Sequence, residues 1–204
     1  MTKRPATADE ALTRLMAGND RFVRGDARFP TVQKEILAQL ARAQRPYATI
    51  LGCSDSRVPP ELLFDAGFGE LFVIRVAGNT LSAEVAGSMQ CAALHLQTQL
   101  FVVLGHEGCG AVEAAMATRF GGVQHSHRIQ LLVDNIVPGL SEPDPHLSPA
   151  AQLTRAVEDN VQWTIAQIRR TPEAQARRAE GKIKLVGAVC EIESGRVHFL
   201  PERA

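Results

Sequence analysis

Two short segments, far apart in the chain, carry side chains that can bind a metal ion. The first is Cys53-Ser-Asp55-Ser-Arg57 and the second is His106-Glu-Gly-Cys109. Their two thiols and one imidazole form a donor set that suits zinc, whereas soft sulfur donors argue against magnesium or calcium. Three protein ligands leave one tetrahedral position open, which is typical of a catalytic rather than a structural zinc.

Each of these segments directly follows a run of apolar residues. Residues 47–51 and 100–104 are predicted to be short, buried strands, so both metal-binding groups come at strand carboxyl ends. In open α/β sheets, ligands bind in the crevice just beyond those ends. The sequence therefore predicts that the two segments converge on one zinc ion.

A simpler interpretation treats Cys53 and Cys109 as buried thiols, His106 as a core histidine, and Asp55 with Arg57 as an ordinary ion pair. The position of both segments at strand ends favours the metal site, because buried charged groups are rare without a partner or a task. Asp55 and Arg57 are two residues apart, so they project to the same side of an extended chain and can pair.

Asp55 has two possible roles beside a zinc ion. It can occupy the fourth coordination position itself, which closes the site, or it can accept a hydrogen bond from a bound water and orient it. Two thiolates cancel the charge of the ion, so such a water should be less acidic than at a three-histidine site. We therefore expect activity to rise on the alkaline side of neutrality.

Length and charge balance favour one domain without an anionic polymer or membrane as its partner. The chain has 204 residues, and 22 Lys and Arg balance 22 Asp and Glu. This balance gives no reason to expect nucleic acid or an anionic membrane as a partner. No apolar run has the length of a signal sequence or a membrane span, so we expect a cytoplasmic protein. Of the four cysteines, Cys91 and Cys190 are predicted to be small buried hydrophobic residues.

Hydrophobic periodicity predicts an α/β fold with a mostly parallel central sheet flanked by helices. The Thr7–Glu10 segment has the pattern of a capping box, and Asn79 is a candidate cap for a later helix. The last two strands form either a terminal hairpin or a central strand with an edge strand. The expected helices cover residues 8–24, 32–43, 81–97, 110–118, 127–137 and 149–170, and the expected strands cover 47–51, 71–76, 100–104, 183–191 and 196–200.

The motifs C-S-D-S-R-V and G-H-x-x-C-G, with the segment Gly69–Arg75 between them, resemble the β-class carbonic anhydrases. The resemblance runs from about Ala8 to Leu200. It implies a single domain over residues 1–204, with about four parallel strands, an additional edge strand, and an N-terminal helical arm (1–45) that clasps a neighbour. It further implies a homodimer or homotetramer that hydrates carbon dioxide reversibly to bicarbonate and a proton by attack of zinc-bound hydroxide.

The resemblance also assigns roles to individual residues. It makes Cys53, His106 and Cys109 the zinc ligands, with Asp55 as an additional ligand only in a closed state, and it makes Asp55 and Arg57 the catalytic dyad. Residues that would contact substrate are Gln44, Phe72 and Gly110, and His95 is the first candidate for a proton shuttle.

For Gln44, Phe72 and His95, ordinary roles remain open. Gln44 suits a solvated helix end, Phe72 suits a strand in the core, and His95 suits a helix flank. Two other functions also remain open. One is hydrolysis of carbon disulfide or carbonyl sulfide on the same scaffold, and the other is a zinc-stabilised sensor without turnover, against which Asp55 and Arg57 argue.

Overall fold

The computed structural model describes residues 5–28 and 34–202 and is built around one five-stranded sheet. The strand order is β2-β1-β3-β4-β5; the first four strands are parallel and β5 is antiparallel to β4. The expected α/β class with four parallel strands and one edge strand is confirmed. The strands are β1 (Ala48–Gly52), β2 (Leu71–Arg75), β3 (Leu100–His106), β4 (Lys184–Cys190) and β5 (Val197–Phe199).

The two central strands that precede the metal-binding segments are fully buried. Every residue of β1 and of β3 is buried, as expected for parallel strands covered on both faces. They are direct neighbours, with Gly52 opposite Leu104. Their carboxyl ends therefore lie side by side, and β3 extends two residues beyond the expected end to include His106.

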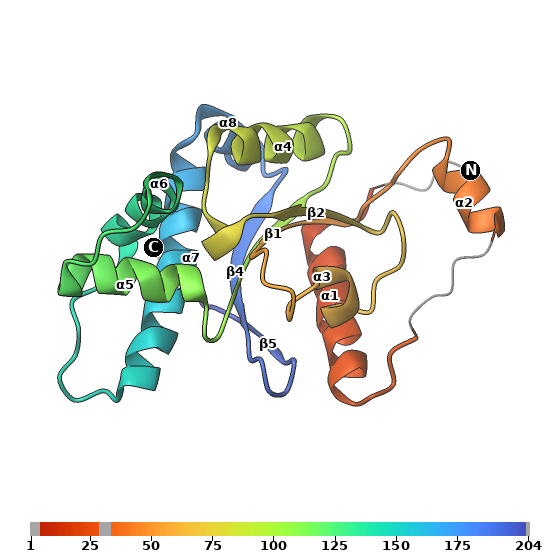
Figure 1. The fold of residues 1–204 in the computed structure, drawn as a ribbon. Coiled ribbons are helices and arrows are strands. Elements are labelled where there is room, and N and C mark those ends of the chain that lie inside the picture. Colours follow the sequence, from red (N-terminus) through yellow and green to blue (C-terminus); the bar gives the residue numbers. More distant parts are fainter. Residues whose placement is uncertain (1–4, 29–33, 203–204) are drawn as a thin grey trace.

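Helices cover both faces of the sheet, as Figure 1 shows. On one side lie α1 and α3, while α5, α6 and α7 lie on the other, and α7 packs along β3 and β4. The helices are α1 (Ala8–Val23), α2 (Lys34–Leu40), α3 (Pro60–Leu63), α4 (Ala83–Leu94), α5 (Gly110–Gly121), α6 (His127–Ile136), α7 (Pro149–Arg170) and α8 (Pro172–Ala179), with 3-10 turns η1 (Ala77–Asn79) and η2 (Val137–Gly139).

Helix α7 packs closely on the sheet where two strand residues facing it are glycines. A Cβ atom at Gly105 would stand 2.7 Å from Cγ2 of Val161, and one at Gly187 would stand 2.8 Å from Cγ1 of the same valine. Both distances are shorter than normal carbon contacts. A larger residue at either position would therefore force α7 or its Val161 side chain to move.

The N-terminal segment, expected as a helical arm, divides into two parts. The predicted capping box is present, since Thr7 and Glu10 each bond the backbone N–H of the other. Helix α1 packs on the sheet through Ala11 and Leu15, which are completely buried. Helix α2 lies apart from the strands in Figure 1, with its apolar residues Ile36 and Leu37 exposed. Residues 32–33 of the expected second helix lie outside the described residues.

Three expectations need correction. Ser82, not Asn79, caps α4, because Asn79 is buried in the preceding turn η1. Cys91 is exposed on α4 rather than buried, whereas Cys190 is buried as expected. Helix α8 was not anticipated, because its sequence is mostly polar and has no apolar period, and it starts with Thr171 and Pro172 directly after α7. Among the described residues, no helix is long and apolar enough to cross a membrane.

Candidate metal centre

The structure brings Cys53, His106 and Cys109 together at the carboxyl ends of β1 and β3. Cys53 follows β1 directly, His106 is the last residue of β3, and Cys109 is the N-cap residue of α5. Gly108 has φ of 61°, which makes the tight turn between the second and third of these residues possible. One donor atom from each of the three lies within 4.8 Å of the others, and all three residues are buried.

The geometry of this cluster fits a tetrahedral zinc ion. The sulfur atoms of Cys53 and Cys109 are 4.0 Å apart, close to the separation of about 3.8 Å that two Zn–S bonds of 2.3 Å produce at a tetrahedral angle. The His106 ring is held through Nδ1, which lies 2.9 Å from the carbonyl oxygen of Glu107. Its Nε2 atom is buried and has no hydrogen-bond partner among the described residues. A metal ion bound by the cluster would give this nitrogen a partner.

Asp55 and Arg57 form the expected pair at the rim of the cluster. Arg57 donates from Nε to Oδ1 of Asp55 over 2.9 Å and from Nη2 to Oδ2 over 2.7 Å, and its backbone N–H donates to Oδ1 as well. Oδ2 of Asp55 lies 3.9 Å from Nε2 of His106. The hydrogen bonds from Arg57 hold the pKa of Asp55 far below its usual range, so the carboxyl group is ionised at physiological pH.

The two thiols of the cluster differ strongly in pKa. A hydrogen bond from Cys109 lowers the pKa of Cys53 to about 4, and the same interaction raises the pKa of Cys109 well above its ordinary value. Burial lowers the pKa of His106, but the neighbouring Cys53 thiolate outweighs that effect and raises it. One thiolate is therefore available at neutral pH, and a metal ion must displace the proton of the second.

Two groups that sequence reasoning missed hold the first ligand segment in place. Arg75, at the carboxyl end of β2, donates from Nε to the carbonyl of Cys53 over 2.8 Å and from Nη2 to the carbonyl of Asp55 over 2.5 Å. The backbone N–H of Gly78, in η1, donates to the sulfur of Cys53 over 3.4 Å. A signal for Arg75 existed, because a parallel strand beside β1 must deliver its last residue to the same edge of the sheet.

The remaining expected site residues do not all lie at the cluster. Gly110 begins α5 directly after Cys109. Gln44 is exposed and precedes β1, and Phe72 pairs with Thr49 near the start of that strand. His95 is exposed at the end of α4, before β3 begins. These last three residues lie at the end of the sheet where the parallel strands begin, whereas the metal ligands lie where β1 and β3 end.

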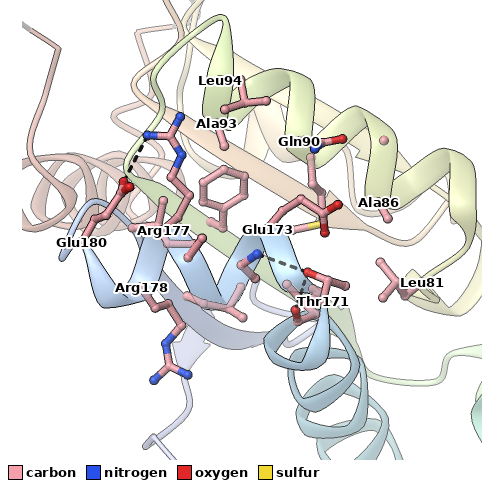
Figure 2. Close-up of a pocket in the computed structure, with 18 of the residues that line it drawn as sticks. Leu81, Ala86, Gln90, Ala93, Leu94, Thr171, Glu173, Arg177, Arg178 and Glu180 are labelled. Carbon is pink, nitrogen blue, oxygen red and sulfur yellow. Dashed lines mark hydrogen bonds and ion pairs between the residues drawn. The ribbon is translucent and has the colours of Figure 1, made fainter.

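A cavity of about 450 Å³ lies away from this cluster, between α4 and α8. Figure 2 shows Gln90 of α4 and Glu173 of α8 on its walls, and Phe101 and Leu185 contribute to its lining. Both of the latter stand near the amino ends of their strands, roughly 16 Å from His106 at 3.3 Å per residue. The cavity is therefore separate from the residues that could do chemistry.

Comparison with known proteins identifies the family. The family model described as carbonic anhydrase matches residues 48–197, which span the whole sheet except its last two residues and include every residue of the cluster. The chain belongs to the β-class carbonic anhydrase family. This membership agrees with the resemblance carried by the two motifs.

Curated relatives and solved structures agree with that assignment. The carbonic anhydrase of Mycolicibacterium smegmatis is 38% identical over 189 residues, with 91% of this chain and 89% of the relative covered. The carbonic anhydrase of Pseudomonas aeruginosa is 32% identical, with 89% and 85% covered. The solved β-carbonic anhydrase CcaA superposes with a TM-score of 0.74 at 26% identity, with 92% of this chain and 94% of that one covered.

Proposed function

We propose that this protein is a zinc-dependent carbonic anhydrase that interconverts carbon dioxide and bicarbonate. One observation carries the proposal. In a chain of this family, a buried cluster holds two sulfurs and an imidazole nitrogen that has no hydrogen-bond partner within residues 5–28 and 34–202. Beside it lies an ionised Asp55 held by Arg57. A zinc ion held by Cys53, His106 and Cys109 would supply a Lewis acid that lowers the pKa of a water ligand towards neutrality.

Asp55 controls which oxygen of the reactants approaches the cluster. Its carboxylate is ionised and can only accept hydrogen bonds, so it favours an oxygen that carries a proton and repels one that does not. In hydration it orients the hydroxyl that attacks carbon dioxide, and in the reverse reaction it accepts from the hydroxyl of bicarbonate. Arg57 keeps the carboxylate aimed by binding both of its oxygens.

The same hydrogen bonds favour an open site over a closed one. For Asp55 to become a fourth ligand, its carboxylate would have to turn away from the guanidinium of Arg57 and give up two charge-assisted hydrogen bonds. With zinc held by the other three residues, Asp55 would therefore stay bound to Arg57 at neutral pH and leave room for a water ligand. Gly110 adds a backbone N–H in the first turn of α5, where such groups have no partner within the helix and attract an anionic oxygen.

Gln44 and Phe72 can serve substrate only from a second copy of the chain. β1 has five residues, so about 17 Å of strand separates the end of the sheet that carries Gln44 from the end that carries Cys53. Their assignment as substrate-binding residues therefore requires a homodimer or homotetramer. In it, the end of one sheet where the parallel strands begin would lie against the metal centre of the other subunit. His95 would also need such an arrangement to carry protons.

Metal content and turnover together test the main proposal. The purified protein should hold one zinc per chain by elemental analysis and should hydrate carbon dioxide in stopped-flow assays between pH 7 and 9. Carbonyl sulfide and carbon disulfide are offered in parallel. Zinc without turnover of any of the three would leave a sensor as the function, and turnover of the sulfur compounds alone would replace the substrate.

Complementation tests the contribution of a second subunit. In the proposed dimer, each site takes Asp55 from one chain and Gln44 from the other. A mixed dimer of Asp55→Ala and Gln44→Ala therefore has one site with both substitutions and one site with neither. Activity should rise when the two variants are unfolded and refolded together, compared with the average of each refolded alone. No gain in a sample shown by sedimentation to be oligomeric would remove Gln44 from the site.

A further inference from the structure

The turn η1 contacts the metal cluster through a backbone N–H group. Gly78 donates its N–H to the sulfur of Cys53 over 3.4 Å. A hydrogen bond to a thiolate ligand orients the sulfur and tunes its electron donation to a metal ion. The position of Gly78 therefore bears directly on the first zinc ligand.

Asn160 of α7 holds the same residue from the opposite side. Its Nδ2 donates to the carbonyl oxygen of Gly78 over 2.8 Å, although 82 residues separate them in the chain. Asn160 is 1% exposed, so water does not compete for this bond. A continuous path thus leads from Asn160 to Gly78 and from Gly78 to the sulfur of Cys53.

The turn needs such a tether because its backbone is unusual. Gly78 has φ of 67° and Asn79 has φ of 44°, so two successive residues are left-handed and one of them is not glycine. Such conformations persist only where the surroundings enforce them. A Cβ at Gly78 would also stand 2.8 Å from Cδ1 of Ile136, so the turn is tightly enclosed.

Asn160 is a poor choice if its role is only to fill the core. Its Oδ1 is buried and has no hydrogen-bond partner among the described residues, and the same holds for Nδ2 of the neighbouring Asn79. Orphaned buried polar atoms cost folding free energy, whereas an apolar side chain of similar size would cost none. The feature that Asn160 offers and a leucine does not is its bond to Gly78.

We propose that Asn160 is a positioning residue for the metal ligand Cys53, which it serves by fixing the Gly78 N–H against the sulfur. The inference rests on the proposed zinc site. It goes beyond that proposal because Asn160 lies on α7, outside both metal-binding motifs.

The test compares Asn160→Leu with Thr164→Val, which also replaces a buried polar residue of α7 with an apolar one of similar shape. Zinc affinity is measured by chelator competition, and the cobalt-loaded proteins are compared by their thiolate-to-metal absorption. We expect Asn160→Leu to bind zinc about tenfold or more weakly and to shift the cobalt band. Thr164→Val should match the wild type in both. Unchanged affinity and an unchanged band in Asn160→Leu would overturn the proposal.

A measurement on the wild-type protein keeps the inference testable even if Asn160→Leu does not fold. In protein loaded with cadmium-113, a scalar coupling between the metal and the Gly78 amide proton reports the N–H···S bond. Its absence overturns the inference while leaving the metal site intact. A wild type that binds neither zinc nor cadmium instead refutes the proposed function and this inference with it.

Discussion

The clearest quantitative expectation concerns Arg75→Met. This substitution removes the hydrogen bonds that clamp the Cys53–Arg57 segment but keeps the length of the side chain. Arg75 makes two charge-assisted hydrogen bonds to the carbonyls of Cys53 and Asp55. Such a bond contributes roughly 1.5–3 kcal/mol when buried. Because Arg75 is exposed, water can replace part of that, and we take about 1 kcal/mol for each bond.

The sum of about 2 kcal/mol corresponds to roughly a 30-fold weaker zinc affinity if the segment, once it lacks the bonds from Arg75, stays disordered until the metal binds. Chelator competition at fixed pH and salt measures the zinc affinity of the variant and of the wild type. Arg128→Met, on the exposed surface of α6, is the matched control. The variant should also unfold at lower urea concentration when zinc is removed. Zinc affinity within twofold of wild type would show that the clamp does not preorganise the site.

Three further expectations follow from the site. Asp55→Ala should keep stoichiometric zinc but lose most carbon dioxide hydration, as stopped-flow rates and elemental analysis will show; full activity would refute the role of the carboxylate. Cys109→Ser should weaken zinc binding by about 100-fold and lower the thermal midpoint of the zinc-loaded protein, because metal binding adds to folding stability; an unchanged midpoint would mean that Cys109 is no ligand. Zinc affinity should rise about tenfold per pH unit between pH 7 and 9, because the raised pKa of Cys109 leaves one proton for zinc to displace. Below pH 7 the affinity should fall more steeply, because His106 also becomes protonated. A flat titration by competition assay would contradict this coupling.

The core of the site was predictable from sequence because its geometry follows from strand periodicity. Apolar runs placed Cys53 and His106 at the ends of parallel strands, and parallel strands bring their carboxyl ends to one edge. The two-residue spacing of Asp55 and Arg57 predicted their pairing, which the hydrogen bonds confirm. The helix boundaries of α7 were also predicted correctly, since its long apolar stripe is unambiguous.

The groups that support the ligands were not predictable in the same way. The strand pattern could place Arg75 at the same end of the sheet as Cys53, but its bonds to backbone carbonyls leave no trace in side-chain patterns. Asn160 directly follows Glu158 and Asp159 in a long helix of mixed polarity, and only the fold shows that it faces η1. Cys91 was expected in the core because α4 is rich in small apolar residues, but its weak amphipathic pattern does not show which face is buried. The cytoplasmic location stays a prediction.

The glycines beneath α7 link the packing of the core to the chemistry of the metal. Asn160 sits next to Val161, the residue that rests against Gly105 and Gly187. Enlarging either glycine by one methyl group would lift the helix and draw the Asn160 amide away from the turn that it tethers. A methyl group added at Gly187, in the middle of β4 and away from every proposed zinc ligand in the sequence, would thus weaken zinc binding through the depth at which α7 packs.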